Sequence, residues 1–190
     1  CQATEWNQET FDEVESATLP TCWNGPLSQA TDGEYSSGWQ VVSSEIEPMG
    51  VSVATNALMG YATGETVMLE MPPVGVDSSL NKVLQFDMMG RQDSGVVEVL
   101  YRSNISSPWT TVDSLQVRDH PDQWHTYYVD LPEVSDYSRL AFRLSSASTS
   151  QIFIDNIKFS SGYLLNATAD ENGSIAPKGY RVVQLGDSIH

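Results

Sequence analysis

Basic residues and cysteines are both scarce in this sequence. Nine Lys and Arg stand against 25 Asp and Glu, which gives a formal net charge of −16. A chain of this charge repels phosphate backbones and anionic membranes, so its composition excludes nucleic acid as a partner. The only cysteines are Cys1 and Cys22, which cannot form a disulfide framework and lack metal-ligand spacing. The sequence leaves three states of the cysteines open: a Cys1–Cys22 bridge, a free and partly buried Cys22, and a lipidated Cys1.

Long apolar runs and catalytic motifs are missing as well. No stretch approaches 18 apolar residues, so we expect no membrane span. There is no G-x-S-x-G, P-loop or helical metalloprotease motif. The segment VVQLGDSI (182–189) is similar to the first block of GDS-type serine esterases, but the Asp and His of those enzymes would follow further downstream. We therefore expect Ser188 to be a turn residue and the chain not to be an enzyme.

Alternation of apolar and polar residues is the main pattern that the sequence does contain. It runs through residues 67–71, 84–88, 97–101, 127–131 and 140–144, whereas no window keeps a helical apolar period. Many half-buried strands joined by turn-rich loops predict an all-β fold, an antiparallel sandwich of two sheets. The side chains expected to point inward are Leu84, Phe86, Val97, Val99, Val129, Leu131, Leu140, Phe142, Ile152 and Ile154.

The segment QIFIDNIKF (151–159) breaks this alternation. Ile152 and Ile154 share one parity, and Ile157 and Phe159 share the other. A regular strand cannot bury all four side chains on one face, because its faces repeat every two residues. One extra residue at Asp155–Asn156, a β-bulge, would restore a common face.

Several motifs resemble the cleaved-adhesin and choice-of-anchor jelly rolls of bacterial surface proteins, which are related in architecture to MAM domains. The resemblance covers roughly residues 8–160. It opens with ETFD (9–12) and LPTCW (19–23) and closes with WHTYYVDLP (124–132), RLAFRLSS (139–146) and IFIDNIKF (152–159). It implies a jelly-roll β-sandwich, here residues 1–160, that is secreted or displayed on the cell surface.

The resemblance also implies a structural Ca²⁺ where the first and last strands meet. The candidate ligands are Glu9, Asp12 and Asp155, with Asn156 as a weaker one. Calcium takes six to eight oxygen ligands, and a bulge can turn a side chain or a carbonyl toward an ion. The alternative is that Asp155 and Asn156 only end a strand segment through side-chain-to-backbone hydrogen bonds.

A change of composition follows Phe159. Ser160-Ser161-Gly162 is typical of a linker, and residues 163–190 contain two strand-like runs around turn clusters. The stretch NATADENGSIAPKG is similar to the opening of bacterial β-repeats of the form T-A-x-x-G-G-S-I-x-P-x-G. About 28 residues cannot bury a core alone, so this segment either starts a truncated second module or docks on the first.

Binding is the function class that these observations leave. Trp39, Trp109 and Tyr35 lie in turn-rich surroundings where exposed rings could stack on sugars, with Tyr61 weaker; the alternative is that the two tryptophans cap the sandwich edges. Trp23 and Trp124 are expected in the core. We therefore expect a monomeric, non-catalytic module that recognises an extracellular glycan or protein ligand. A structural spacer and an accessory domain of a secreted hydrolase are the alternatives.

Overall fold

The computed structural model describes most of the chain. The described residues are 8–31, 34–43, 53–73, 81–91, 95–119, 121–132, 134–169, 171, 173–174 and 179–184. Within these ranges every regular element is a strand except one 3-10 turn, η2 (Val117–Asp119). No helix in this part of the chain is long and apolar enough to cross a membrane. The all-β prediction is confirmed.

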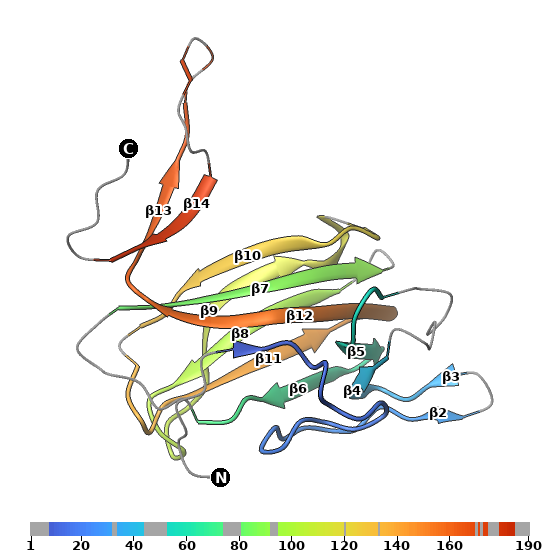
Figure 1. The fold of residues 1–190 in the computed structure, drawn as a ribbon. Helices are drawn as coiled ribbons and strands as arrows, with labels where there is room; N and C mark the ends of the chain where they lie inside the picture. The colour runs from blue at the N-terminus through green and yellow to red at the C-terminus, as the bar shows by residue number, and fades with distance from the viewer. Residues whose placement is uncertain are drawn as a thin grey trace.

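Most of the strands form two antiparallel sheets (Figure 1). The larger sheet has the order β10 (His125–Asp130), β7 (Lys82–Arg91), β12 (Thr149–Ser161), β5 (Ala57–Thr63) and β4 (Gly38–Val42), and β1 (Gln8–Glu9) pairs with β12. The smaller sheet has the order β6 (Thr66–Glu70), β11 (Arg139–Ser145), β8 (Val96–Arg102) and β9 (Thr110–Gln116).

From β5 to β12 the chain changes sheet at every step except between β8 and β9. Sequential strands therefore lie in opposite layers, which is the topology of a jelly-roll sandwich. A short ribbon of β2 (Ala30–Thr31) and β3 (Glu34–Tyr35) precedes β4.

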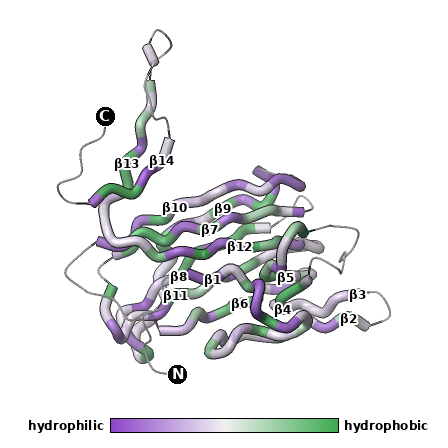
Figure 2. The backbone as a smooth tube through the Cα atoms, viewed as in Figure 1, coloured by the Kyte–Doolittle hydropathy of each residue, from purple (hydrophilic) through white to green (hydrophobic). Residues whose placement is uncertain are grey.

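The core lies between the two sheets and consists of the side chains that the alternation predicts. All ten predicted inward residues are buried and belong to one cluster. Phe142 is at its centre, with its ring 5.1 Å from Phe86 and 6.5 Å from Trp39, measured between centroids. Figure 2 shows hydrophobic and hydrophilic residues alternating along the strands. The period of two is therefore satisfied by burial of one face of each sheet.

The predicted bulge is present in β12. Its register against β7 shifts between Asp155, which pairs with Asp87, and Lys158, which pairs with Gln85. Asn156 has φ of 51°, a left-handed conformation that Asn tolerates better than most residues. Because one extra residue is inserted here, Ile152, Ile154, Ile157 and Phe159 all reach the same core cluster.

Cys22 forms a disulfide bond, which rules out a free Cys22. Cys1, the other cysteine of the sequence, lies outside the described residues.

The C-terminal segment forms a hairpin of β13 (Tyr163–Ala167) and β14 (Gly179–Val183), which rises from the sandwich (Figure 1). Gly162 joins it to β12 with φ of 144°, and a Cβ at this position would collide with the Val183 carbonyl. The Gly162 N–H donates to the Asn81 carbonyl at 2.8 Å, and the Tyr180 ring stacks on Tyr128 with centroids 5.9 Å apart. The hairpin thus touches the sandwich near the start of β7 and on β10.

Deleting residues 162–190 is expected to lower the melting temperature of the sandwich by less than about 4 °C, the effect of about 1 kcal/mol in a domain of this size. The reason is that the hairpin lies outside the core cluster and joins the sandwich mainly through Tyr180 and Gly162. Thermal unfolding followed by circular dichroism measures this. A larger drop would show that the hairpin is an integral part of the sandwich.

Candidate functional site

The first and last strands of the sandwich meet beside the bulge. β1 pairs with the second half of β12, with Glu9 opposite Ile157. Asp155 lies just before this pairing and is only 6% exposed. The junction therefore holds a buried carboxylate at the place where the sequence predicts a calcium ligand.

Asp155 has few partners that favour its charged form. Its pKa is raised to about 6, mainly by burial. Hydrogen bonds from the Asn156 N–H and the Thr55 hydroxyl act to lower the pKa, and the nearby carboxylates of Asp12 and Asp87 act to raise it. The Asn156 N–H donates to Oδ1 at 2.7 Å, and Thr55 Oγ1 donates to Oδ2 at 3.1 Å. Among the described residues no Lys or Arg forms an ion pair with this carboxylate.

These surroundings suit a hard cation, although not with all four predicted ligands. Asp155, Asp12 and the Thr55 hydroxyl are oxygen donors of the kind that Ca²⁺ prefers. Glu9 Oε1 instead accepts the Phe11 N–H at 2.8 Å, and the Asn156 side-chain amide donates to Asp87 Oδ2 at 3.0 Å. The described residues contain no group of three or more His, Cys, Asp or Glu side chains placed to hold a metal. Main-chain carbonyls would have to complete the coordination.

The prediction that Trp39 binds a ligand is wrong. Trp39 is 0% exposed and stacks on Phe142, with Gly60 against its ring. It lies on β4, which the sequence does not reveal as a core strand because turn residues surround it. Its ring therefore packs the sandwich and has no face free for a sugar.

Trp109 and Tyr35 are half-buried. The Arg102 guanidinium covers the Trp109 ring at 4.4 Å from its centroid, in a cation–π contact. Tyr35 packs against Tyr61 with centroids 5.9 Å apart, beside a cavity of about 450 Å³ that Gln29 and Gln40 also line. Tyr35 thus lines a cavity, whereas the Arg102 guanidinium covers one face of the Trp109 ring.

The exposure of Trp124 contradicts the prediction that this residue lies in the core. Trp23 is buried as predicted, but Trp124 is 40% exposed and does not belong to the core. It directly precedes β10, whose residues alternate between the two faces of the sheet. Tyr127 and Val129 face the core, and Thr126 and Tyr128 lie on the outer face. The alternation places Trp124 with the second set, at roughly 13 Å from Tyr128 along an extended strand.

Polar side chains lie between these two rings on the outer face. Thr126 Oγ1 donates to Asp87 Oδ1 at 2.5 Å, and the Asn156 amide occupies the other oxygen of the same carboxylate. Tyr128 pairs with Gln85, which in turn pairs with Lys158. The outer face of the six-stranded sheet therefore carries aromatic rings separated by hydrogen-bonding groups.

At the Tyr128 end of this face, the C-terminal hairpin forms the second wall of a groove. The groove has a volume of about 740 Å³, within the range of ligand sites. We name it the hairpin groove. Its lining comes from β7, β10, the second half of β12, β14 and the residue after β14: Gln85, Tyr128, Lys158, Phe159, Ser160, Ser161, Tyr180, Arg181, Val182 and Gln184.

Sequence reasoning missed the hairpin groove, although one of its signals was present. The period of two already assigns Tyr128 to the polar face of its strand, where a large aromatic side chain is unusual. The residues that the hairpin contributes to the groove could not be predicted, because no sequence pattern indicates where the chain after Gly162 packs.

Comparison with known proteins gives structural neighbours only. No protein-family model matches the chain, and no curated protein matches it significantly. Two cleaved adhesin domains of Lys-gingipain from Porphyromonas gingivalis superpose with TM-scores of 0.56 and 0.54 at 18% and 17% identity. Both alignments cover 82% of this chain and 98% of the adhesin domain.

A carbohydrate-binding module, TmCBM61, whose structure contains β-1,4-galactotriose, superposes with a TM-score of 0.51 at 12% identity. That alignment covers 80% of this chain and 94% of the module. Identities this low establish the fold alone. The chain thus has the jelly-roll β-sandwich fold shared by cleaved adhesin domains and carbohydrate-binding modules.

Proposed function

We propose that this chain is a non-catalytic module of a secreted or cell-surface protein that binds a carbohydrate chain on the outer face of its six-stranded sheet. The observation that carries the proposal is the hairpin groove, in which the stacked rings of Tyr128 and Tyr180 adjoin Gln85 and Ser160. Tyr180 is 52% exposed although it is part of a stacked pair, so ring surface is available to a ligand.

The chemistry of this face suits a sugar. Aromatic rings offer flat apolar surface, and tyrosine and tryptophan add a polar edge for hydrogen bonding. Trp124 at one end and Tyr128 at the other would contact successive parts of an extended chain. Thr126, Gln85 and Lys158 supply polar groups between or beside them. The galactotriose bound by one structural neighbour supports a carbohydrate as the ligand class.

Replacing Tyr128 with alanine is expected to weaken carbohydrate binding by about tenfold or more, because burial of an aromatic ring contributes about 1.5–3 kcal/mol. A glycan array identifies a ligand, and isothermal titration calorimetry then measures the affinity of each variant. Trp124→Ala should weaken binding of longer chains more than that of short ones.

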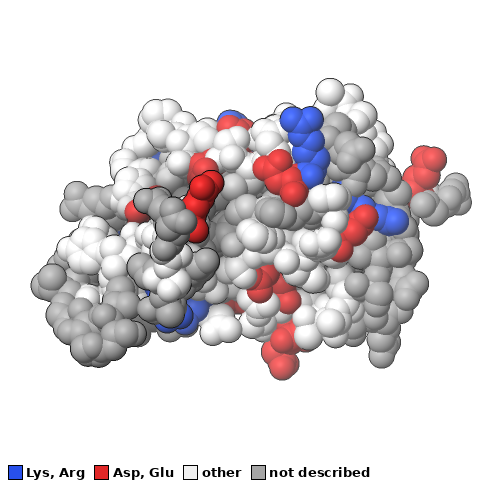
Figure 3. All heavy atoms as spheres, turned by 90° about the horizontal axis from the view of Figure 1, so that it is seen from above, with Lys and Arg blue, Asp and Glu red and all other residues white. Residues whose placement is uncertain are grey.

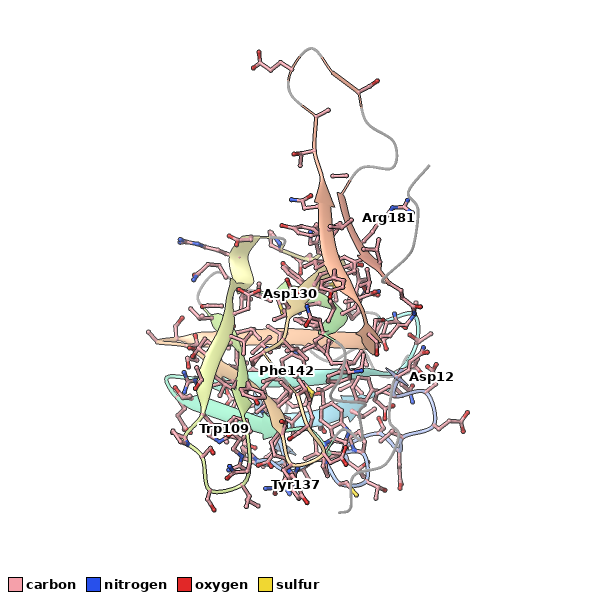
Figure 4. The ribbon with its side chains drawn as sticks, turned by 90° about the vertical axis from the view of Figure 1, so that its left-hand side faces the viewer. Asp12, Trp109, Asp130, Tyr137, Phe142 and Arg181 are labelled. Atoms are coloured by element: carbon pink, nitrogen blue, oxygen red, sulfur yellow. The ribbon has the colours of Figure 1, made fainter. Side chains whose placement is uncertain are left out.

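Tyr137→Ala is the matched control, because Tyr137 is highly exposed and lies at the end of the sandwich away from the hairpin (Figure 4). It should bind like the unmodified protein. If the array detects no carbohydrate, or if Tyr137→Ala weakens binding as much as Tyr128→Ala, the outer face is not a carbohydrate site. A spacer role would then explain the domain better.

The proposal includes a structural calcium ion at the junction of β1 and β12. Asp155 and Asp12 would bind it, with the Thr55 hydroxyl and main-chain carbonyls as further oxygen donors. The ion would neutralise a buried carboxylate that has acidic neighbours on two sides. Its role is stability, because the ion would tie the first strand to the last and lies outside the hairpin groove.

A further inference from the structure

The hairpin groove is basic in a strongly acidic protein. Figure 3 shows acidic side chains scattered over the face seen from above, with few basic ones among them. Over the whole sequence, 25 Asp and Glu outnumber nine Lys and Arg. The described residues that line the hairpin groove include Lys158 and Arg181 and no Asp or Glu.

Most basic side chains elsewhere are neutralised by partners. Each of four arginines forms an ion pair with a carboxylate: Arg91 with Asp122, Arg102 and Arg139 with Glu70, and Arg143 with Glu98. Among the described residues, Lys82, Arg118, Lys158 and Arg181 form no ion pair. Three of these four lie in or beside the hairpin groove, so the unneutralised positive charge of the described residues is concentrated there.

Lys82 lies beside the hairpin groove, where it contacts the lining residue Ser161. It is 4% exposed, and its ammonium donates to Ser161 Oγ at 2.5 Å. A buried cation without a counter-ion is unfavourable, and a bound anion would relieve it. Because Ser161 Oγ accepts from Lys82, its own hydroxyl hydrogen is available to donate to an acceptor in the groove that Ser161 lines.

Two acids of the larger sheet, Asp87 and Asp130, are not part of the groove lining. Asp87, two residues along β7 from Gln85, accepts hydrogen bonds from Thr126 and Asn156. Asp130 lies at the end of β10 and is not part of the groove lining; in Figure 4 it lies below the hairpin, from which Arg181 projects. Lys158, Arg181 and Ser161 thus present hydrogen-bond donors to a single space.

We propose that the hairpin groove selects an acidic carbohydrate, with Lys158 and Arg181 binding a carboxylate or sulfate group on the sugar that contacts the stacked pair of Tyr128 and Tyr180. The inference rests on the carbohydrate-binding function proposed above and narrows its ligand class. It also gives the C-terminal hairpin a function, since two of these four residues come from β14.

Four probes of similar length test the ligand class by isothermal titration calorimetry. They are an oligogalacturonate, a sulfated galactan oligosaccharide, a neutral galacto-oligosaccharide and a polyglutamate peptide. We expect at least one acidic sugar to bind about tenfold or more tightly than the neutral one. The sugar that binds identifies carboxylate or sulfate as the recognised group. Added salt should weaken this binding, because exposed charges are screened.

Variants separate the role of charge from that of shape. Lys158→Gln and Arg181→Gln are each expected to weaken binding of the acidic sugar about tenfold, the effect of losing a hydrogen bond to a charged group. Binding of the neutral sugar should change less than twofold. Arg118→Gln is the matched control, because Arg118 also lacks an ion pair but lines a different cavity, and it should bind normally.

The outcomes distinguish this inference from the proposed function. If acidic and neutral sugars bind equally well, and Arg181→Gln changes neither affinity, the groove does not select acidic sugars. The proposal that the outer face binds a carbohydrate would then still stand. If neither acidic sugar binds but the glycan array detects a neutral carbohydrate, only the acidic ligand is overturned. If the array also detects no carbohydrate, both proposals fail. If polyglutamate binds as tightly as the acidic sugar, the groove recognises anions in general, and selection of a sugar is overturned.

Discussion

Replacing Trp39 with alanine is expected to destabilise the sandwich by about 3–5 kcal/mol, the usual cost of removing a large aromatic side chain from a core. Trp39 is fully buried, stacks on Phe142 and packs against Gly60. Removing it would leave a cavity between β4 and the smaller sheet. Against a typical stability of about 5–15 kcal/mol this is a large loss.

Urea unfolding measures this loss, and thermal unfolding should show a drop of roughly 6–20 °C. Trp109→Ala is the matched control, because Trp109 is half-buried and covered by Arg102 on one face. It should cost no more than about 1 kcal/mol, which is the range of an exposed cation–π contact. A Trp39→Ala variant that kept its stability and lost carbohydrate binding would reverse the assignment of Trp39 to the core.

Calcium and pH are expected to act on stability through the same residue, Asp155. In the presence of a chelator, the free energy of unfolding should fall as the pH rises from about 4 to about 7. The sign follows from the pKa of Asp155, which is about 6 in the folded protein against an ordinary value of 3.8. The folded state holds this proton more tightly than the unfolded chain, so stability is lost as the proton leaves.

A shift of this size corresponds to about 2–3 kcal/mol between the two ends of the titration. Asp12, Asp87, Thr55 and Asn156 are the groups that face Asp155. Calcium should restore stability above about pH 6, where the carboxylate is charged, by about 2.7 kcal/mol at a hundredfold excess over its dissociation constant. Magnesium, which is smaller and holds its water more firmly, should not.

Asp155→Asn should remove both the calcium response and most of the pH dependence, and it should be as stable as the unmodified protein or more stable when a chelator is present. Asp130→Asn is the control, because Asp130 is exposed and lies outside the junction. If chelation changes nothing at pH 7 while the pH dependence persists, Asp155 is a buried acid without a metal. If neither response appears, the bulge has only a structural role.

The sequence predicted the fold well because alternation is a local property that the fold must satisfy. A strand that buries one face has to place its apolar residues two apart, and all ten side chains predicted inward on this basis are buried. The bulge was predictable for the same reason. Only one extra residue between Ile154 and Ile157 could bring both to the same core.

Composition likewise established the sign of the overall charge. A net charge of −16 predicts repulsion of phosphate backbones by the molecule as a whole. What composition could not show is that Lys158, Arg181 and Lys82 gather at one groove. That arrangement depends on the pairing of β12 with β7 and on the position of the hairpin.

The sequence alone thus determined the strand faces, the bulge and the sign of the surface charge, and the tertiary structure decided which aromatic rings meet solvent. Trp39 and Trp124 both follow turn-rich residues, yet the first is buried against Phe142 of the opposite sheet and the second is 40% exposed. The exposure of a side chain depends on what packs over it, and the covering residues come from distant parts of the chain. For this reason Trp39 was mistaken for a ligand-binding residue, and the hairpin groove became visible only once residues after Gly162 had been placed against β10.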